Sequence, residues 1–185
     1  MGAPTTEFKQ IPTDGSVAAG DIDTGAERNT AMSTWSAVDV GTPLDFGSVS
    51  ISGGAANSSV QAVAFRVTAF NGNTTVTNMR FWVTENFADS TVNWAKVDLD
   101  AGDWVATPTP SNPTSAATPT SEPGTQNVLK ADSSTTDLTD EYTDVSDTTE
   151  AIVLHIAVGA SETLGTYQGT AGSQDLQFNL KFDFS

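Results

Sequence analysis

The sequence has no cysteine and few basic residues. Seven Lys and Arg stand against 23 Asp and Glu, which gives a net charge of −16 over 185 residues. Without cysteine the chain can form neither a disulfide nor a thiolate metal site. The scarcity of Lys and Arg also argues against direct contact with nucleic acid, because neutralising phosphates requires clustered basic side chains.

Long apolar runs are absent as well. No stretch of about 18 apolar residues occurs, and the first 20 residues lack the basic head and apolar core of a secretory signal. From the sequence we therefore expect neither a membrane-spanning helix nor Sec-dependent export.

The acidic surplus points to a protein adapted to high salt. So many carboxylates repel one another and weaken a compact state unless concentrated cations screen them. An acidic disordered chain would also be this negative, but it would have few aromatic and β-branched residues. This sequence has nine Phe, four Trp and several Val and Ile runs, so we expect it to fold.

Alternation of apolar and polar residues predicts a mostly β chain. The clearest strands are 60–70, 74–83 and 175–184, and a turn at 71–73 is expected to join the first two as a hairpin. Residues 151–158 are apolar on both faces, which predicts a central strand covered by a second sheet or by a neighbouring subunit. Further strands are predicted at the ranges 45–52, 92–99 and 103–106, and short helices are possible at 25–35 and 87–96.

The fold class predicted from this pattern is all-β: a single jelly-roll β-barrel or sandwich with an extended N-terminal arm and long loops. Residues 1–44 are assigned to the arm and 45–185 to the barrel domain. Within the domain, 107–124 is a Thr/Pro-rich loop and 132–150 an acidic loop or edge strand. Arm residues 1–44 are expected to matter more for assembly than for folding.

The single histidine, His155, is the one side chain with an ordinary pKa near neutrality. It lies within the apolar run AIVLHIAV, where a packed or interface histidine is the usual occupant. No nucleophile turn of the G-x-S-x-G type and no phosphate-binding glycine loop accompanies it. We therefore expect no enzyme activity and no catalytic residue.

Carboxylate clusters are weak candidates for metal binding, because carboxylate oxygens suit Ca²⁺ and Mg²⁺. The candidate ligands are Asp21, Asp23, Asp98, Asp100 and Asp103. Neither cluster has the bidentate Glu at the twelfth position of a calcium loop, and a solvated turn explains both. We expect no cofactor beyond loosely bound Na⁺, K⁺, Ca²⁺ or Mg²⁺ ions.

Tryptophan suggests a role in binding or assembly. Trp82 alternates with Phe81, and Trp94 alternates with Val97 and Leu99, so both are candidates for a strand face that points away from the core. The alternative is a sandwich whose strands are partly buried on both faces.

The whole chain resembles the smaller major capsid protein of haloarchaeal icosahedral viruses with an internal membrane. The resemblance is carried by its length, acidity, lack of cysteine, strand layout, Thr/Pro-rich loop and the ending LQFNLKFDFS. It implies a single jelly-roll barrel standing upright in a shell, made in the host cytoplasm and found in the virion.

The implied partners are copies of the chain, a larger related major capsid protein, and penton or minor capsid proteins. The arm or the base of the barrel is then expected near the internal membrane. The alternative function is a haloarchaeal cell-surface or carbohydrate-binding β-sandwich, favoured by the same Trp residues and the mucin-like TPTPSNPTSAATPT segment.

Overall fold

The computed structural model describes residues 2–13, 16–17, 25–39, 42–97, 118–128, 130, 141–145, 147–163, 169–170, 173–174 and 176–185. The chain is mostly β, with antiparallel sheets and one short helix in this part. The elements in chain order are β1 (Thr5–Ile11), α1 (Gly25–Met32), β2 (Ala56–Asn57), β3 (Gln61–Ala69), β4 (Val76–Glu85), β5 (Ser90–Val97), β6 (Ala151–Val158), β7 (Gly169–Thr170), β8 (Ser173–Gln174) and β9 (Leu176–Phe184).

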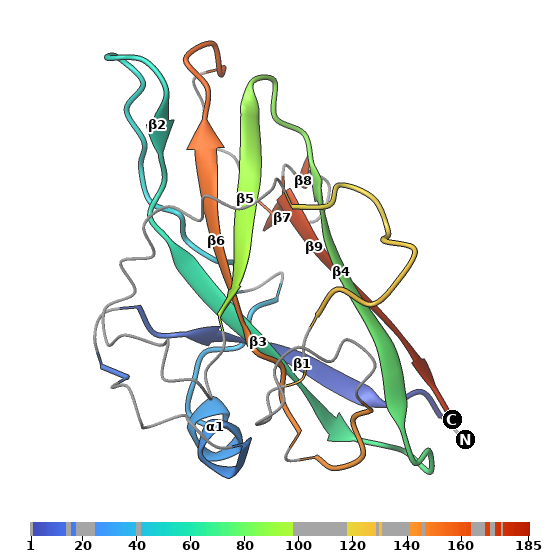
Figure 1. Cartoon of the computed structure of the whole chain (residues 1–185). Helices are drawn as coiled ribbons and strands as arrows, with labels where there is room; N and C mark the ends of the chain where they lie inside the picture. Colours follow the sequence, from blue (N-terminus) through green and yellow to red (C-terminus); the bar gives the residue numbers. More distant parts are fainter. Residues whose placement is uncertain are drawn as a thin grey trace.

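The larger sheet has five strands with β6 at its centre (Figure 1). β1 pairs with β3, β3 pairs with the first half of β6, and β5 runs along the whole other edge of β6. The two-residue β2 pairs with the last residues of β6. The central position predicted for residues 151–158 is confirmed.

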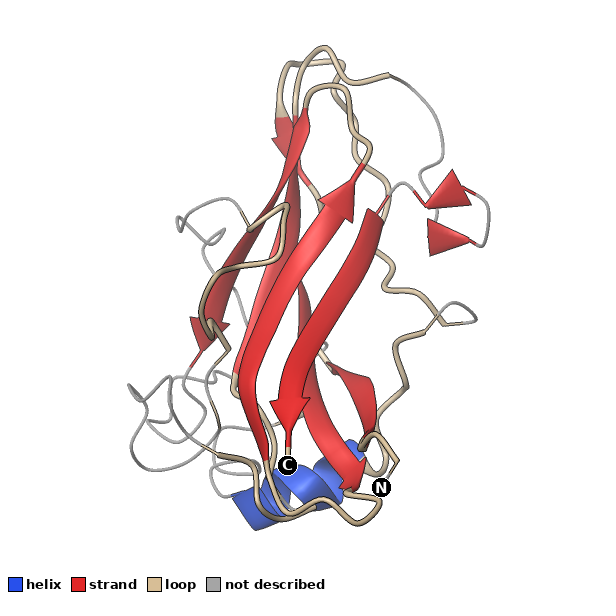
Figure 2. Ribbon diagram, turned by 90° about the vertical axis from the view of Figure 1, so that its right-hand side faces the viewer, coloured by secondary structure: helices blue, strands red, loops and turns tan. Residues whose placement is uncertain are grey.

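The smaller sheet consists of the long strands β4 and β9, which lie in front in Figure 2. Its register shifts between Thr77 and Arg80, where Asn78 has a φ of 52°. This is a β-bulge, and the Asn78 amide donates to Asp183 Oδ2 at 2.7 Å. The predicted strand at 175–184 is confirmed as β9.

The two sheets pack face to face around an aromatic core. Across the two sheets, the ring of Phe8 lies 6.3 Å from that of Phe81 and the ring of Phe65 lies 6.2 Å from that of Phe182. Within the larger sheet, the rings of Phe8 and Phe65 are 5.6 Å apart. Phe65 and Phe81 are fully buried. Alternation is what makes this possible, because one face of every long strand carries the apolar side chains.

The outer face of the larger sheet has its own cover, supplied by the N-terminal segment. Ala62, Ala64 and Ala151 present small side chains there, so that Met32 and Trp35, at and just after the end of α1, pack closely on the sheet. One face of β6 is therefore covered by a second sheet, as predicted, since Ile152 and Leu154 pack against the smaller sheet. The other face is covered by the N-terminal segment of the same chain.

The described parts of residues 1–44 do not form an extended arm. β1 pairs along its whole length with β3, and Ile11 is fully buried. The predicted helix at 25–35 is confirmed as α1, and it ends where the Ser33 and Thr34 hydroxyls hydrogen-bond to carbonyls one turn back. Deleting this segment would remove a strand and uncover the sheet.

The predicted hairpin of residues 60–70 and 74–83 is wrong in its pairing, although both strands and the turn exist. Asn71 and Gly72 have φ values of 53° and 89°, as the turn requires. However, β3 belongs to the larger sheet and β4 to the smaller one. Their apolar faces stack against each other across the core, and alternation alone does not distinguish stacked from paired strands.

Other predicted elements have mixed outcomes. Residues 45–52 form no strand, because Gly47 has a φ of 72° and its N–H donates to Asp45 Oδ1 in a tight local turn. The strand predicted at 92–99 is present as β5, so 87–96 is not helical. Residues 103–106, 107–117 and 131–140, and thus much of both predicted loops, lie outside the described residues.

Candidate functional site

The five predicted metal ligands lie outside the part of the chain that the structure describes: Asp21, Asp23, Asp98, Asp100 and Asp103. Within the described ranges, no group of three or more His, Asp or Glu side chains is arranged to hold a metal ion.

His155 is buried in the larger sheet, with an exposed fraction of 2%. Its Nε2 lies 3.3 Å from the Asn93 amide nitrogen on the neighbouring strand β5, and its buried Nδ1 has no hydrogen-bond partner among the described residues. Burial lowers the pKa of His155 below its ordinary value of 6.5. The ring is therefore set between strands rather than in an open site.

The four tryptophans divide into different environments. Trp35 is buried against the outer face of the larger sheet, and Trp94 packs into the aromatic core 5.8 Å from the Phe81 ring. The expectation that Trp94 faces outward is therefore wrong, since its neighbour Val92 two residues away is also in the core. Trp82 does lie on the outer face of β4, half-buried, and Trp104 is outside the described residues.

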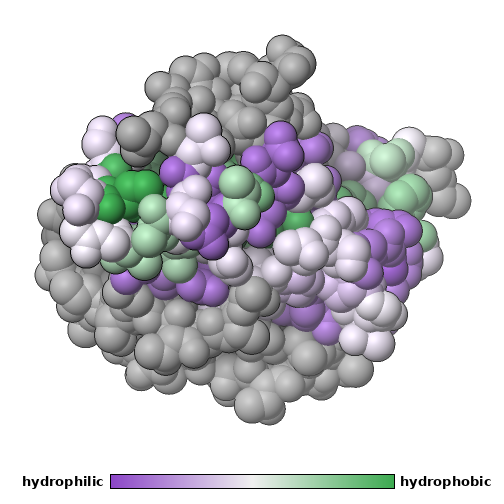
Figure 3. Space-filling view, turned by 90° about the horizontal axis from the view of Figure 1, so that it is seen from above, coloured by the Kyte–Doolittle hydropathy of each residue, from purple (hydrophilic) through white to green (hydrophobic). Residues whose placement is uncertain are grey.

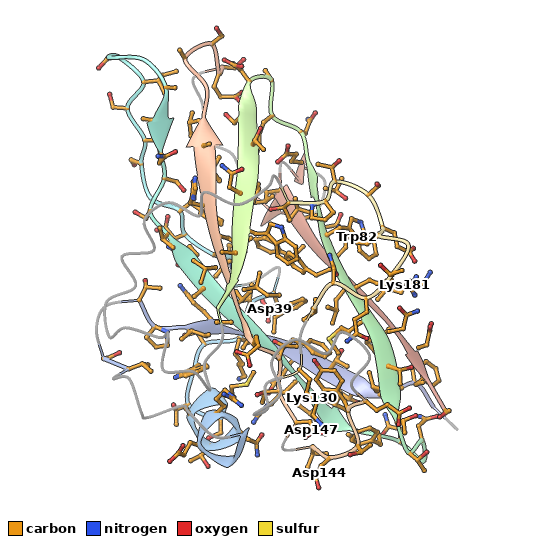
Figure 4. The ribbon with its side chains drawn as sticks, viewed as in Figure 1. Asp39, Trp82, Lys130, Asp144, Asp147 and Lys181 are labelled. Carbon is orange, nitrogen blue, oxygen red and sulfur yellow. The ribbon has the colours of Figure 1, made fainter. Side chains whose placement is uncertain are left out.

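The outer face of the smaller sheet carries most of its polar groups, together with Trp82. The residues of this polar face are Arg80, Trp82 and Thr84 on β4, and Gln177, Asn179, Lys181 and Asp183 on β9. Trp82 is paired directly with Asn179, and Arg80 with Lys181. Figure 4 shows Trp82 and Lys181 on this same side of the molecule.

Glu122 links the two basic residues of the polar face. Its carboxylate lies 2.5 Å from the Arg80 guanidinium and 2.9 Å from Lys181 Nζ. The hydrogen bond from Lys181 lowers the pKa of Glu122. Arg80 also lies 3.6 Å from Asp183, so the two cations are balanced by two carboxylates. Such a face is nearly neutral in an otherwise strongly acidic chain.

A second polar cluster lies at the upper end of the molecule, where β5 begins. The Glu162 carboxylate accepts hydrogen bonds from the Ala88 and Asp89 N–H groups and from the Ser90 hydroxyl. It is only 7% exposed, so it fastens the loop between β4 and β5. Seen from above, the described surface at this end is mostly hydrophilic or neutral, with separate hydrophobic patches (Figure 3).

Glu85 lies close to this cluster. Burial raises its pKa, the charge of Glu162 adds to the rise, and the hydrogen bond from the Val92 N–H opposes it. A raised pKa means that this carboxyl group favours the folded state most at low pH, and that the contribution is lost as the pH rises through the raised value. The cluster therefore holds the loop between β4 and β5 in place, and its contribution to the stability of the fold depends on pH.

A further ion pair stabilises the lower end of the molecule. Lys130 Nζ lies 3.4 Å from Asp147 Oδ2, which also accepts from the N–H groups of Thr143 and Asp144. Figure 4 shows Lys130 and Asp147 side by side. Thr143, Asp144 and Asp147 belong to the stretch 132–150 predicted as an acidic loop, and here the Asp147 carboxylate organises a tight turn.

The free edge of β4 is sealed by irregular segments. Tyr142 exchanges backbone hydrogen bonds with Val76, and Pro119 O accepts from the Val83 N–H. Between these two points the Asn127 side chain accepts from the Phe81 N–H and donates to the Phe81 carbonyl, both at 2.8 Å. Gln126 Oε1 accepts from the Met79 N–H. We call this the sealed edge: the outward main-chain groups of Val76, Met79, Phe81 and Val83.

The free edge of β9 is different. The main-chain groups of Phe81 face Asn127, so those of the next residue, Trp82, face its partner Asn179 on β9. The alternate residues Phe178, Leu180 and Phe182 therefore point their main-chain groups away from β4. None of these three residues has a hydrogen-bond partner for those groups in the described part of the chain. We call this row the open edge.

Sequence reasoning identified the alternation of β9 but not the sealed edge or the ion pairs of Glu122. The side-chain partners Glu122, Gln126 and Asn127 lie 42 to 47 positions from the β4 residues that they contact, and they form no repeating pattern. The only hint was the pair of side-chain amides at Gln126 and Asn127, which can imitate a peptide group.

Comparisons with known proteins give no match. No family model, no curated protein and no solved structure matches the chain. In the described residues no helix is long and apolar enough to cross a membrane.

Proposed function

We propose that this chain is a structural major capsid protein, which forms capsomers of an icosahedral shell around an internal membrane in a halophilic archaeal virus. The observation that carries the proposal is the pairing of two antiparallel sheets around one aromatic core in an acidic, cysteine-free chain whose whole length resembles that family. The finer fold we propose is a single jelly roll.

The strand connections support that fold. The chain passes from the larger sheet to the smaller one between β3 and β4, returns at β5, and crosses again between β6 and β9. Repeated crossing between two antiparallel sheets is what jelly rolls and related sandwiches require. The strands β4, β5, β6 and β9 also run along the length of the molecule, as a barrel standing upright in a shell would need (Figure 1).

The chemistry of the described residues supports a structural rather than an enzymatic role. The single histidine is buried between strands, the Glu162 carboxylate holds a loop, and Glu122 and Asp183 balance the charges of Arg80 and Lys181. We propose that the partners are copies of this chain, a larger related major capsid protein, and penton or minor capsid proteins of the same virion.

The proposal is tested by asking where the protein is found. Particles and envelope fractions would be separated by density from an infected haloarchaeal culture and examined by mass spectrometry. We expect the chain in particles, in a constant ratio to a larger β-rich protein. Its recovery in the envelope fraction, with none in particles, would overturn the capsid proposal.

A cell-surface or carbohydrate-binding role is the second candidate, and one observation favours it. Trp82 lies outward beside Asn179 and Thr84, and an aromatic ring with nearby amide and hydroxyl groups is a common platform for sugars. Retention on immobilised cell-wall polysaccharide that is lost in Trp82→Ala, but kept in the neighbouring variant Thr84→Ala, would support this role over the capsid role.

A further inference from the structure

The open edge is a nine-residue strand with one side unpaired. β9 contains no proline and no glycine, and none of its residues has a positive φ. Proteins usually protect such an edge with a proline, a bulge, a cover or an unpaired charge, because exposed N–H and C=O groups invite another strand. On β9 the one lysine, Lys181, is already paired with Glu122.

The side chains along the open edge are incompletely covered. Leu176, Phe178, Leu180 and Phe182 pack against the core, yet each remains partly exposed, and Phe184 is 47% exposed. The aromatic residues of β4, by contrast, include the fully buried Phe81. A strand placed beside β9 would remove more of this apolar surface from water, which favours association.

The charge of the smaller sheet affects which partner can approach the open edge. β4 and β9 together carry two basic residues, Arg80 and Lys181, and two acidic residues, Glu85 and Asp183, while the whole chain has a net charge of −16. Two copies of so acidic a protein repel each other over most of their surface. The neutral smaller sheet is a surface on which that repulsion is least.

From these observations we propose that β9 pairs, antiparallel, with β9 of a second copy of this chain, with Leu180 at the centre of the two-fold axis. The pairing would join two smaller sheets into one four-stranded sheet. A two-fold contact of this kind uses the same edge on both copies, so it closes on itself and leaves no free edge.

The parity of the open edge limits the possible registers. Only even-numbered residues of β9 point their main-chain groups outward, so they must pair with even-numbered residues of the second copy. Centring on Leu180 pairs all nine residues and places Lys181 opposite Asn179 of the second copy. Centring on Lys181 also satisfies parity, but it would set the two Lys181 ammonium groups opposite each other, which is unfavourable.

This inference goes beyond the proposed function and does not depend on it, since the pairing concerns the isolated chain. A dimer found in solution would be compatible with a shell subunit or with a cell-surface protein. Its absence would leave the particle experiment above unaffected.

The first test uses charge at the predicted register. In a salt solution that keeps the chain folded, Asn179→Asp should tighten the dimer and Asn179→Lys should weaken it, each about 2- to 30-fold in Kd, because two symmetric cross-strand pairs change. Repulsion between whole chains predicts the opposite order, since Lys lowers the net negative charge. Sedimentation velocity over a concentration series measures Kd.

The control substitutions are Thr84→Asp and Thr84→Lys, on the same polar face but on β4, away from the open edge. We expect them to follow the whole-chain charge, with a weaker dimer for Asp. If the Asn179 variants follow the same order as the Thr84 variants, the Leu180-centred register is wrong.

The second test uses the absence of native cysteine. The double variant Asn179→Cys, Lys181→Cys places a thiol opposite a thiol twice in the proposed register, and mild oxidation should then give a covalent dimer. Each single variant should give far less, because residue 179 does not face residue 179 of the second copy. Equal cross-linking in the double and single variants, or a sedimentation coefficient that stays monomeric at every concentration, would overturn the proposal.

Discussion

The two edges of the smaller sheet are treated in opposite ways by the same chain. Along β4, the outward main-chain groups of Met79, Phe81 and Val83 are met by residues 118–128 from a distant loop. Along β9, the equivalent groups of Phe178, Leu180 and Phe182 meet nothing in the described part of the structure. The difference shows that this fold can seal an edge with loop carbonyls and side-chain amides when no strand is available.

The two strands also differ in how deeply they are buried. Val76, Met79, Phe81 and Val83 of β4 have exposed fractions of 0%, whereas the apolar residues of β9 are only partly covered. Because an edge that is both unpaired and incompletely covered is one that a partner can complete, we interpret β4 as the folding edge and β9 as the assembly edge.

Lowering the salt concentration should affect assembly and folding more than any of the substitutions below. Lowering the salt concentration from about 1 M to about 0.1 M lengthens the Debye length from about 3 Å to about 10 Å, so carboxylate repulsion reaches much further. With a net charge of −16, we expect assemblies to dissociate first and the subunit to unfold next.

Sedimentation and circular dichroism in parallel salt series measure the two steps. A melting temperature and a sedimentation coefficient that stay constant across the range would contradict the reading of the acidic surplus as an adaptation to high salt.

Among single substitutions, Phe81→Ala on β4 should be the most damaging. The Phe81 ring contacts Phe8, Trp94 and Phe178, so its loss leaves a cavity between the sheets and should lower the free energy of unfolding by about 3 to 5 kcal/mol. The matched control on β9 is Phe184→Ala, which removes a half-exposed ring and should cost about 0.5 kcal/mol or less. Denaturant titration compares them, and equal losses would remove the distinction between the strands.

Breaking the sealed edge should have an intermediate effect. Asn127→Ala leaves the buried N–H and C=O groups of Phe81 without partners and should lower the free energy of unfolding by about 1 to 3 kcal/mol. Gln177→Ala, on the exposed face of β9, serves as the control and should change it by about 0.5 kcal/mol or less. If Asn127→Ala is as mild as the control, water replaces the side-chain amide and the edge is not sealed by it.

The smallest effect is expected at His155 and depends on pH. Because burial lowers its folded-state pKa, the unfolded chain takes up the proton first as the pH falls below about 6.5, and the free energy of unfolding then decreases. His155→Gln should flatten this decrease between about pH 7 and pH 5, while leaving assembly intact if the fold survives.

Thermal melts of both proteins across that range provide the measurement for His155. An unchanged pH slope would show that the ring does not titrate on unfolding. The loss of an enzymatic turnover in a folded His155→Gln protein would contradict the structural role assigned to this residue.

Sequence alternation was enough to find most of the long strands. It located β3, β4, β6 and β9 because their apolar residues repeat with a period of two or run continuously. It missed β1, whose two apolar anchors, Phe8 and Ile11, point to opposite faces of the sheet and so show no repeat. Residues 45–52 were predicted as a strand, but Gly47 turns the chain locally and no strand forms.

Pairing and the candidate site were harder to read from the sequence. The segment after β3 was predicted to return as a hairpin, but an apolar face serves equally well for stacking between sheets. The sealed edge depends on Asn127, 46 positions away from Phe81, and on contacts that have no sequence signature. The role of Glu162 is similar, since it fastens backbone groups 73 to 74 positions away.

Hydrogen exchange of individual backbone amides tests the central claim, that β4 carries the folding edge and β9 the assembly edge. In dilute protein we expect the N–H groups of Phe178, Leu180 and Phe182 to exchange rapidly, and those of Phe81 and Val83 to be protected. At concentrations where the chain assembles, the three open-edge amides should become protected and the sealed edge should not change. Open-edge amides that still exchange rapidly in the assembled protein would contradict the account.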